Sequence, residues 1–324
     1  MVKLEIDLDT LREFERGLDP RHPDQSRLPA RVLGYGEIST VFAIDMEGMR
    51  GLAFKRLPIF RTEAEMAQYQ ATYEEYNRLL EEKIGLSLPL HGHAAFLTDT
   101  GRPIFYIVQQ ELPALSIGNR AIHLLSHQDT LLLVHRVLQK LCKVWEFNHR
   151  QDRWQVGIDG QISNWAIDGF DVEHPQMEEQ ARLYYMDTST PLFRVQGVEQ
   201  LNPELFLRSA PFFLAWILRL FFLEDVVNRY YDFHRVAVDL VANFYKEQRP
   251  DLIPDAVKVV NETFTRDVAH LDVPPISEKE VQAYYREDAF IWSFYLAARK
   301  VDRFLCTKLL RREYPYILPE KIKR

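Results

Sequence analysis

Two polar residues five positions apart, Asp159 and Asn164, have the side chains that transfer of a phosphoryl group would need. They lie in the stretch VGIDGQISNWAI, which reads as a turn that leads into a strand. Transfer to a hydroxyl uses a carboxylate beside the attacking oxygen and an amide oxygen that helps to hold a magnesium ion. Asp187 follows the apolar stretch LYYM, a position that would suit a further magnesium ligand. Each aspartate alone is typical of a turn, so the chemical interpretation depends on the ordered set.

A turn with two glycines and a lysine in a strand could hold the phosphates of a nucleotide. In GYGEISTVF, Gly34 and Gly36 let backbone amides approach an anion closely. The turn connects two strands and no GKS or GKT follows, which argues against a dinucleotide-binding fingerprint and a Walker A loop. Lys55 lies in the apolar stretch LAFKRL, either at an exposed strand edge or facing phosphates with a carboxylate partner. Glu74 and Glu75, in the helix that follows, are the candidate partners.

The elements that would position these residues change along the chain from strands to helices. A hairpin pattern comes first, then one helix, then two further strand-like stretches, and beyond Pro113 helical patterns dominate. This order predicts an α+β fold with two lobes: a small N-terminal antiparallel sheet with one helix, and a larger, mainly helical C-terminal lobe. The predicted parts are an N-terminal extension at 1–30 with a helix at 10–16, an N-lobe at 31–112 with a helix at 62–83, and a C-lobe at 113–324.

By type and order, these features resemble the protein-kinase superfamily, and most closely its branch of small-molecule kinases, which includes aminoglycoside phosphotransferases and choline kinases. The resemblance runs from about Arg31 to Phe193. It rests on the glycine turn GYGEISTV, the strand lysine, a helix glutamate, the hinge-like strand YIVQQELP, the loop DGQISN and the aspartate of MDTS. It implies ATP and Mg²⁺ as cofactors and a small molecule with a hydroxyl as the acceptor, while the oligomeric state stays open.

The resemblance implies that residues of the N-lobe hold ATP. Backbone amides of the glycine turn would cover the phosphates, and Lys55 would contact the α- and β-phosphates. Lys55 would pair with Glu75 or Glu74. Glu75 is favoured because Leu79 follows it by four residues, as in the family's pattern. The turn and hinge residues expected at the nucleotide are Gly34, Gly36, Ser39, Thr40, Gln110, Glu111 and Leu112.

In the C-lobe the resemblance implies that Asp159 orients and deprotonates the acceptor hydroxyl, and that Asn164 and Asp187 bind magnesium. The sequence also departs from the family. No His takes the usual place in the catalytic loop, where Gly157 stands two residues before Asp159. The stretch HRQD ending at Asp152 is rejected as that loop, because Gly157, five residues later, has no side chain to bind a metal.

Further departures follow the metal aspartate. Asp187 is followed by Thr-Ser and not by Phe-Gly, and the gap between Asn164 and Asp187 is about ten residues longer than is usual in the family. No Ala-Pro-Glu segment follows. These differences leave open an alternative function, a catalytically weak or inactive kinase-like protein (a pseudokinase) that serves as a nucleotide-binding or interaction module.

The composition argues against several other classes of protein. The net charge of −7 argues against a general nucleic-acid binder. Cys142 and Cys306 have no CxxC partner, so neither a disulfide framework nor a structural zinc site is expected.

The N-terminus lacks the apolar run of a signal peptide, and we expect a cytoplasmic protein. Arg208 and Arg219 interrupt the apolar segment 205–227, so we expect a helix of the helical lobe there and not a membrane span.

Overall fold

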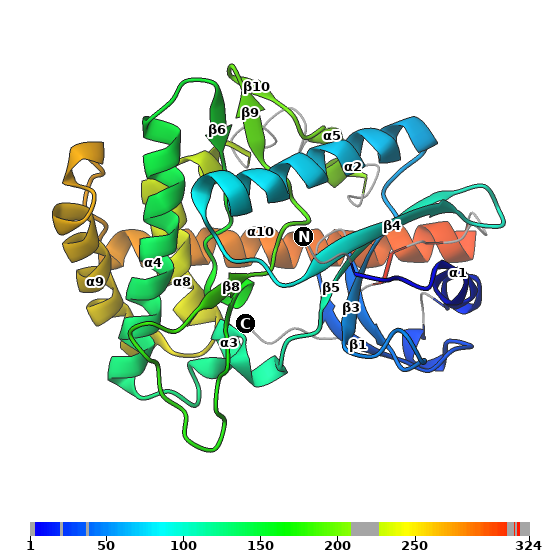
Figure 1. Cartoon of the computed structure of the whole chain (residues 1–324), viewed down its shortest axis with the longest axis horizontal. Helices are drawn as coiled ribbons and strands as arrows, with labels where there is room; N and C mark the ends of the chain where they lie inside the picture. The colour runs from blue at the N-terminus through cyan, green and yellow to red at the C-terminus, as the bar shows by residue number, and fades with distance from the viewer. Residues whose placement is uncertain are drawn as a thin grey trace.

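The structure is a computed structural model that describes residues 4–19, 22–36, 39–208, 227–309, 314 and 316–317. It has two lobes side by side (Figure 1). One lobe contains a five-stranded antiparallel sheet flanked by helices, and the other contains most of the helices with a few short strands. This confirms the predicted α+β fold class with a small N-terminal sheet and a mainly helical C-terminal lobe.

The sheet places the predicted lysine in its middle strand. Its strands are β1 (Ala30–Tyr35), β2 (Thr40–Ile44), β3 (Leu52–Leu57), β4 (His91–Leu97) and β5 (Pro103–Gln110). They are ordered β1-β2-β3-β5-β4, and every neighbouring pair is antiparallel. Lys55 on β3 pairs with Val41 on β2 and Ile107 on β5. Lys55 therefore lies inside the sheet and not at its edge.

Helix α2 (Glu63–Arg78) covers the face of the sheet from which Lys55 projects, and a π-helical turn at Leu79–Ile84 extends it. The helix begins at Thr62, whose Oγ1 accepts a hydrogen bond from the backbone nitrogen of Glu65 at 3.2 Å. The extension ends at Gly85, whose φ of 77° suits a residue without a side chain. The helix predicted at 62–83 is therefore confirmed.

Helix α1 (Leu8–Gly17) covers the opposite face of the sheet. Leu11 and Phe14 are fully buried there, and the Phe14 ring contacts the Phe42 ring edge-on, with centroids 5.2 Å apart. A sheet that is apolar on both faces needs cover on both. The segment predicted as an N-terminal extension therefore completes the core of the N-lobe. On this face the Arg56 and Glu15 side chains, 3% and 6% exposed, form an ion pair of 2.6 Å.

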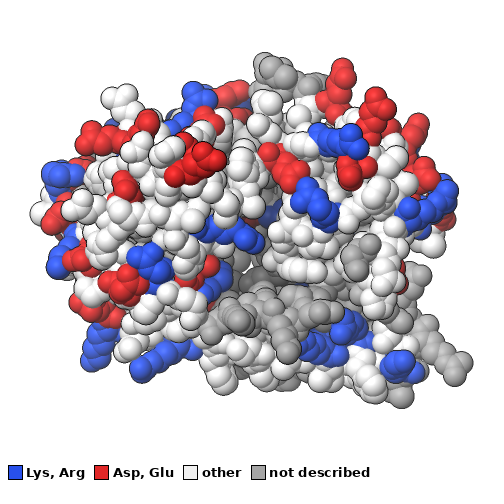
Figure 2. All heavy atoms as spheres, turned by 90° about the horizontal axis from the view of Figure 1, so that it is seen from below, with Lys and Arg blue, Asp and Glu red and all other residues white. Residues whose placement is uncertain are grey.

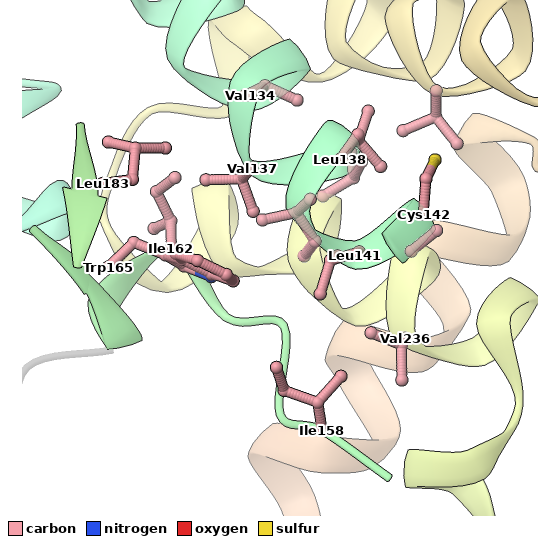
Figure 3. Packing of buried hydrophobic residues seen from close by; sticks show 14 of the residues in the cluster. Val134, Val137, Leu138, Leu141, Cys142, Ile158, Ile162, Trp165, Leu183 and Val236 are labelled. Carbon is pink, nitrogen blue, oxygen red and sulfur yellow. The ribbon is translucent and has the colours of Figure 1, made fainter. Parts of the chain in front are cut away.

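The C-lobe is built around helix α4. Its longer helices are α4 (His127–His149), α8 (Phe233–Lys246), α9 (Ile253–Arg266) and α10 (Glu278–Phe304), with α3 (Gly118–Ala121) and α5 (Glu204–Leu207) as short helices. Short strands β6 (Trp154–Val156), β7 (Trp165–Ile167), β8 (Leu183–Tyr185), β9 (Phe193–Val195) and β10 (Val198–Glu199) lie beside them. Figure 3 shows how Val137 and Leu141 of α4 pack around Ile158, Ile162 and Trp165. The loop that carries Asp159 and Asn164 is therefore anchored in this core on both sides of the aspartate.

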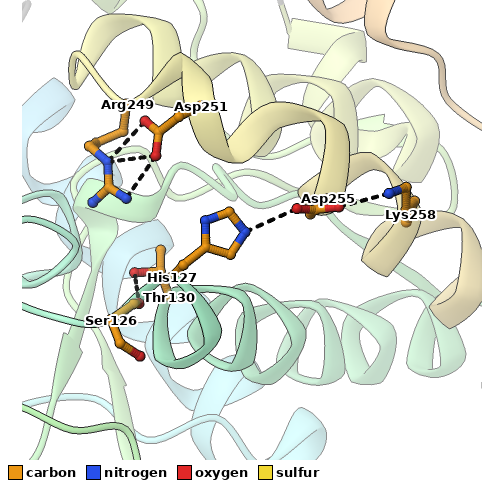
Figure 4. Close-up of polar contacts among 7 residues, drawn as sticks. All are labelled: Ser126, His127, Thr130, Arg249, Asp251, Asp255 and Lys258. Atoms are coloured by element: carbon orange, nitrogen blue, oxygen red, sulfur yellow. Dashed lines mark hydrogen bonds and ion pairs between the residues drawn. The ribbon is translucent and has the colours of Figure 1, made fainter.

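Polar contacts join the start of α4 to α9 (Figure 4). The Oγ of Ser126 accepts a hydrogen bond from the backbone nitrogen of Asp129 and caps α4. His127 Nε2 lies 3.0 Å from an Asp255 carboxylate oxygen, and Asp255 also pairs with Lys258. These side chains are largely exposed, so the pairs contribute little beside the apolar contacts of α4.

The long helix α10 runs behind both lobes (Figure 1). Arg299 near its end is buried, with its guanidinium over the Tyr316 ring at 5.2 Å. Ile317 is buried in the N-lobe core together with Leu11 and Phe42. Besides the connection at 111–113, described residues near the C-terminus thus also link the helical lobe to the N-lobe core.

Most of the apolar segment predicted at 205–227 lies outside the described residues. Its first residues belong to α5. Among the helices of the described part of the chain, none has both the length and the apolar character needed to cross a membrane.

Candidate active site

A cleft of about 440 Å³ lies between the two lobes. Seen from below, the molecule is hollowed between its halves, and Lys and Arg side chains stand at the edge of the hollow (Figure 2). The cleft is lined by three cationic side chains, Lys55, Arg120 and Lys246. The predicted site residues that line it are Gly34, Gly36, Lys55, Gln110, Glu111, Leu112, Asn164 and Asp187. The structure therefore brings together residues from both lobes that the sequence only placed in order.

Lys55 forms a hydrogen-bonded ion pair with Asp187, the predicted metal ligand. Its Nζ lies 2.7 Å from Asp187 Oδ1 and 2.7 Å from Ser189 Oγ. Burial alone acts to raise the pKa of Asp187, but the Lys55 ammonium and the Ser189 bonds outweigh it and hold this pKa below its usual value. The carboxylate is therefore ionised near neutral pH.

The predicted pairing of Lys55 with Glu75 or Glu74 is not found. Glu75 instead forms an ion pair of 2.7 Å with Arg78, one turn further along α2, and Glu74 accepts a bond from Gln70. The reason is the helical phase, because the face of α2 that points to the site carries tyrosines and leaves both glutamates to the side.

The glycine turn between β1 and β2 closes tightly. The Gly36 nitrogen donates to the Ser39 carbonyl at 2.9 Å, and a Cβ at Gly36 would come within 2.6 Å of Ser39 Oγ. The tip of the turn at 37–38 lies outside the described residues. Ser39 and Thr40, which were expected at the nucleotide, are buried and line a small space together with Arg299. Among the described residues of the turn, Gly34 and Gly36 line the cleft, whereas Ser39 and Thr40 do not.

Two backbone amides of the segment 110–112, which was expected at the nucleotide, already have partners in the N-lobe. The Gln110 nitrogen donates to the Leu90 carbonyl and the Glu111 nitrogen to the Gly51 carbonyl, both at 2.7 Å. These two amide hydrogens are thus used within the sheet. The groups of 110–112 that can face a base are the carbonyl oxygens and the Leu112 amide.

Apolar side chains that the sequence analysis did not single out form the walls of the cleft beside the hinge. They come from both lobes and are Leu33, Val41, Ala53, Ile117 and Met186. A slot with two apolar walls suits a planar ring system. Two of these residues could have been predicted from the sequence, because side chains two positions apart in a strand lie on the same face. Ala53 lies two residues before Lys55, and Val41 pairs with Lys55 on the neighbouring strand.

Asp159, the predicted base, lies in the loop between β6 and β7 and is not among the residues that line the cleft. Its Oδ1 accepts a bond from the Gln161 nitrogen at 3.1 Å. Desolvation by the surrounding protein, then the negative charges of Asp239 and Asp187, raise the pKa of Asp159 to about 7. Asp239 on α8 accepts a hydrogen bond from Gln161 Nε2 at 3.2 Å.

The donor atoms of Asn164 and Asp187 fit a magnesium ion. The Met186 nitrogen donates to the Asn164 carbonyl at 2.8 Å, which holds the two ligand segments together. Asn164 Nδ2 points to the Asp159 carbonyl, so its Oδ1 is left for a cation. One carboxylate and one amide oxygen are hard ligands of the kind that Mg²⁺ takes together with water and phosphate oxygens. No group of three or more His, Cys, Asp or Glu ligands occurs among the residues that the structure describes.

Comparisons with solved structures find similar chains at low identity. One is WaaP in complex with acyl carrier protein, with 13% identity, a TM-score of 0.33, and coverage of 79% of this chain and 93% of that chain. Another is the GDP complex of aminoglycoside 2'-phosphotransferase-IIIa, with 10% identity, a TM-score of 0.32, and coverage of 81% and 100%. The GDP complex of a mutant of that phosphotransferase has 9% identity, a TM-score of 0.31, and coverage of 81% and 98%.

Comparisons by sequence give a family without an activity. None of the curated proteins matches the chain. One family model, described as "Family of unknown function (DUF6206)", matches residues 21–303. Because the match extends over most of the chain, the protein belongs to this family.

Proposed function

We propose that the protein is an ATP- and magnesium-dependent phosphotransferase that acts on a hydroxyl of a small molecule. The observation that carries the proposal is the meeting of Lys55, Asn164 and Asp187 at one cleft with apolar walls beside a hinge. A cation for phosphates, two oxygen ligands for a metal and a slot for a base are the parts that phosphoryl transfer from a nucleotide requires.

Each residue would have a positional task in this reaction. Magnesium, when bound, would neutralise charge on the β- and γ-phosphates. Asn164 and Asp187 would hold it, and Lys55 would turn from Asp187 toward the phosphates, a short movement because its Nζ already lines the cleft. Catalysis would then come mostly from orientation and from charges fixed in advance.

Asp159 would orient the acceptor hydroxyl and accept its proton. A base is most effective when its pKa is close to the working pH, and a pKa of about 7 meets this condition. The acceptor would lie between this loop and α8, where Gln161 bonds to Asp159 through its backbone nitrogen and to Asp239 through its side chain.

The test measures binding and turnover separately. Thermal shift with ATP and Mg²⁺ reports binding, and ADP release with a panel of hydroxylated metabolites reports turnover. Asp159→Asn should keep nucleotide binding and lose turnover by a factor of about a hundred or more. Asp187→Asn should weaken the magnesium-dependent part of binding. Asp168→Asn, on an exposed residue just after β7, is the matched control and should change neither.

Three results would contradict the proposal in different ways. A wild-type protein without any shift at millimolar ATP and Mg²⁺ would exclude nucleotide binding, and with it phosphoryl transfer. Binding without turnover would favour a nucleotide-binding or interaction module. Unchanged turnover in Asp159→Asn would remove this residue from the role of base.

A further inference from the structure

We propose that Ser189 and Tyr69 position Lys55 in place of a helix carboxylate. In this arrangement the Ser189 hydroxyl holds the lysine ammonium, and the Tyr69 hydroxyl fixes the Ser189 backbone to helix α2. The inference rests on the proposed phosphotransferase function and identifies positioning residues for its site.

The side of α2 that faces the site is neutral. Its buried residues within the described helix are Met66, Tyr69, Thr72, Tyr73, Tyr76 and Asn77. A lysine that projects into this space needs an acceptor, because an ammonium group without one is costly to bury. The helix supplies no carboxylate from these positions, so the acceptors of Lys55 must come from another segment.

Ser189 is built into the site as such an acceptor. It is 4% exposed, and its Oγ lies 2.7 Å from Lys55 Nζ and 2.7 Å from Asp187 Oδ1. A hydroxyl has one hydrogen to donate and lone pairs to accept, whereas an ammonium group can only donate and a carboxylate can only accept. The Ser189 hydroxyl therefore accepts from Lys55 and donates to Asp187, which orders all three groups.

Tyrosine hydroxyls connect this triad to the helix. Tyr69 Oη donates to the Ser189 carbonyl at 2.8 Å, and Tyr76 Oη donates to the Gly157 carbonyl at 2.9 Å. Both rings are almost fully buried. Helix α2 thus holds the metal-ligand segment with one tyrosine and the start of the catalytic loop with another, through bonds that carry no net charge.

The arrangement would matter most with a metal bound. A magnesium ion held by Asp187 would compete with the Lys55 ammonium for the carboxylate oxygens. Ser189 would then remain as an acceptor that holds Nζ of Lys55 at the cleft. A hydrogen bond to a charged group is typically worth ten- to a hundredfold in an equilibrium or rate, so its loss is measurable.

The experiment compares Ser189→Ala, Tyr69→Phe and Glu75→Gln in the full chain. Mg–ATP affinity and kcat/KM are measured, with the unfolding midpoint as a check of folding. Ser189→Ala should lower kcat/KM for ATP by roughly ten- to a hundredfold. Tyr69→Phe should cause a smaller loss, because it acts through Ser189. Glu75→Gln, which only breaks the pair with Arg78, should keep the wild-type value.

A double-mutant cycle separates positioning from a general structural effect. If Ser189 acts through Lys55, Ser189→Ala should weaken Mg–ATP binding in the wild-type background and cause no further loss in a Lys55→Met background. Equal losses in both backgrounds would overturn the inference, as would a Glu75→Gln variant that loses as much as Ser189→Ala. In either case a wild type that binds and turns over ATP leaves the proposed function standing. A wild type that does not bind Mg–ATP overturns both.

Discussion

Asp159→Asn should make the protein more stable at alkaline pH while turnover falls by a factor of about a hundred or more. The native environment raises the pKa of Asp159 from 3.8 to about 7, chiefly by desolvation and by the charges of Asp239 and Asp187. The folded state therefore binds this proton more tightly than the unfolded state. Stability from this group is present below pH 4 and is lost as the pH rises through 7. Asparagine has nearly the same shape and no charge to desolvate.

The size of the effect follows from the shift in pKa. A difference of about three pKa units corresponds to roughly 4 kcal/mol in the free energy of unfolding. This is an upper limit for the substitution, because Asp239 shares the interaction. The variant and the wild type should have similar stability below about pH 4, and the difference should grow as the pH rises from there to about 7. At pH 8 the variant should be more stable by about 2 to 4 kcal/mol.

Urea unfolding of both proteins at several pH values between 5 and 8 measures this difference. Subtraction of the two curves cancels the pH dependence of all groups that the proteins share. A gap that widens with pH supports the account of Asp159 as a carboxylate ionised at a cost to stability. A gap that stays constant with pH, or a variant that is less stable at pH 8, would refute it.

Three further substitutions test other parts of the structure. Glu15→Ala would leave the buried Arg56 guanidinium without its bidentate partner and should lower the free energy of unfolding by about 3 kcal/mol or more, measured by urea unfolding. Gly118→Ala would place a Cβ 2.3 Å from the Ile162 carbonyl oxygen, so the catalytic loop must shift; kcat should fall and stability should drop by about 1 to 3 kcal/mol. Asp239→Asn removes one charge that raises the pKa of the catalytic-loop aspartate, so the acid limb of the pH–rate profile should move to lower pH by up to about one unit. The expectations would be contradicted by unchanged stability of Glu15→Ala, by an unchanged kcat of Gly118→Ala, or by an acid limb of the pH–rate profile that does not move in Asp239→Asn.

The parts of the fold that the sequence predicted depend on local pattern. Alternation in the strands and the helical pattern at 62–83 are set by neighbours in the chain, and both lobes were predicted from such patterns. Lys55 lies in a strand of the sheet, and Asn164 and Asp187 line the same cleft. The spacing of Asp159 and Asn164 could be read from the sequence because both residues are on one short loop. The approach of Asn164 to Asp187 instead depends on the pairing of two separate segments.

The parts that the sequence did not predict depend on contacts between distant segments. The phase of helix α2 decides whether Glu75 or a tyrosine faces Lys55, and a helix rich in both types does not reveal it. Nothing in the sequence distinguishes Ser189 from other loop serines, whereas in the structure its hydroxyl lies between Lys55 and Asp187. Asp239 is far from Asp159 in the sequence, so only the packing of α8 brings its charge to the loop.

The burial of Ile317 beside Leu11 and Phe42 also bears on how the protein folds. These residues share one apolar cluster although Leu11 and Ile317 lie about 300 positions apart along the chain. Contacts between such distant positions form late, because the closure of a long loop costs entropy before the contact can compensate for it. During synthesis, the sheet of the N-lobe would leave the ribosome long before this part of its core. The N-lobe is thus expected to mature only after the helical lobe, and a nascent chain halted before Ile317 should expose apolar surface to chaperones.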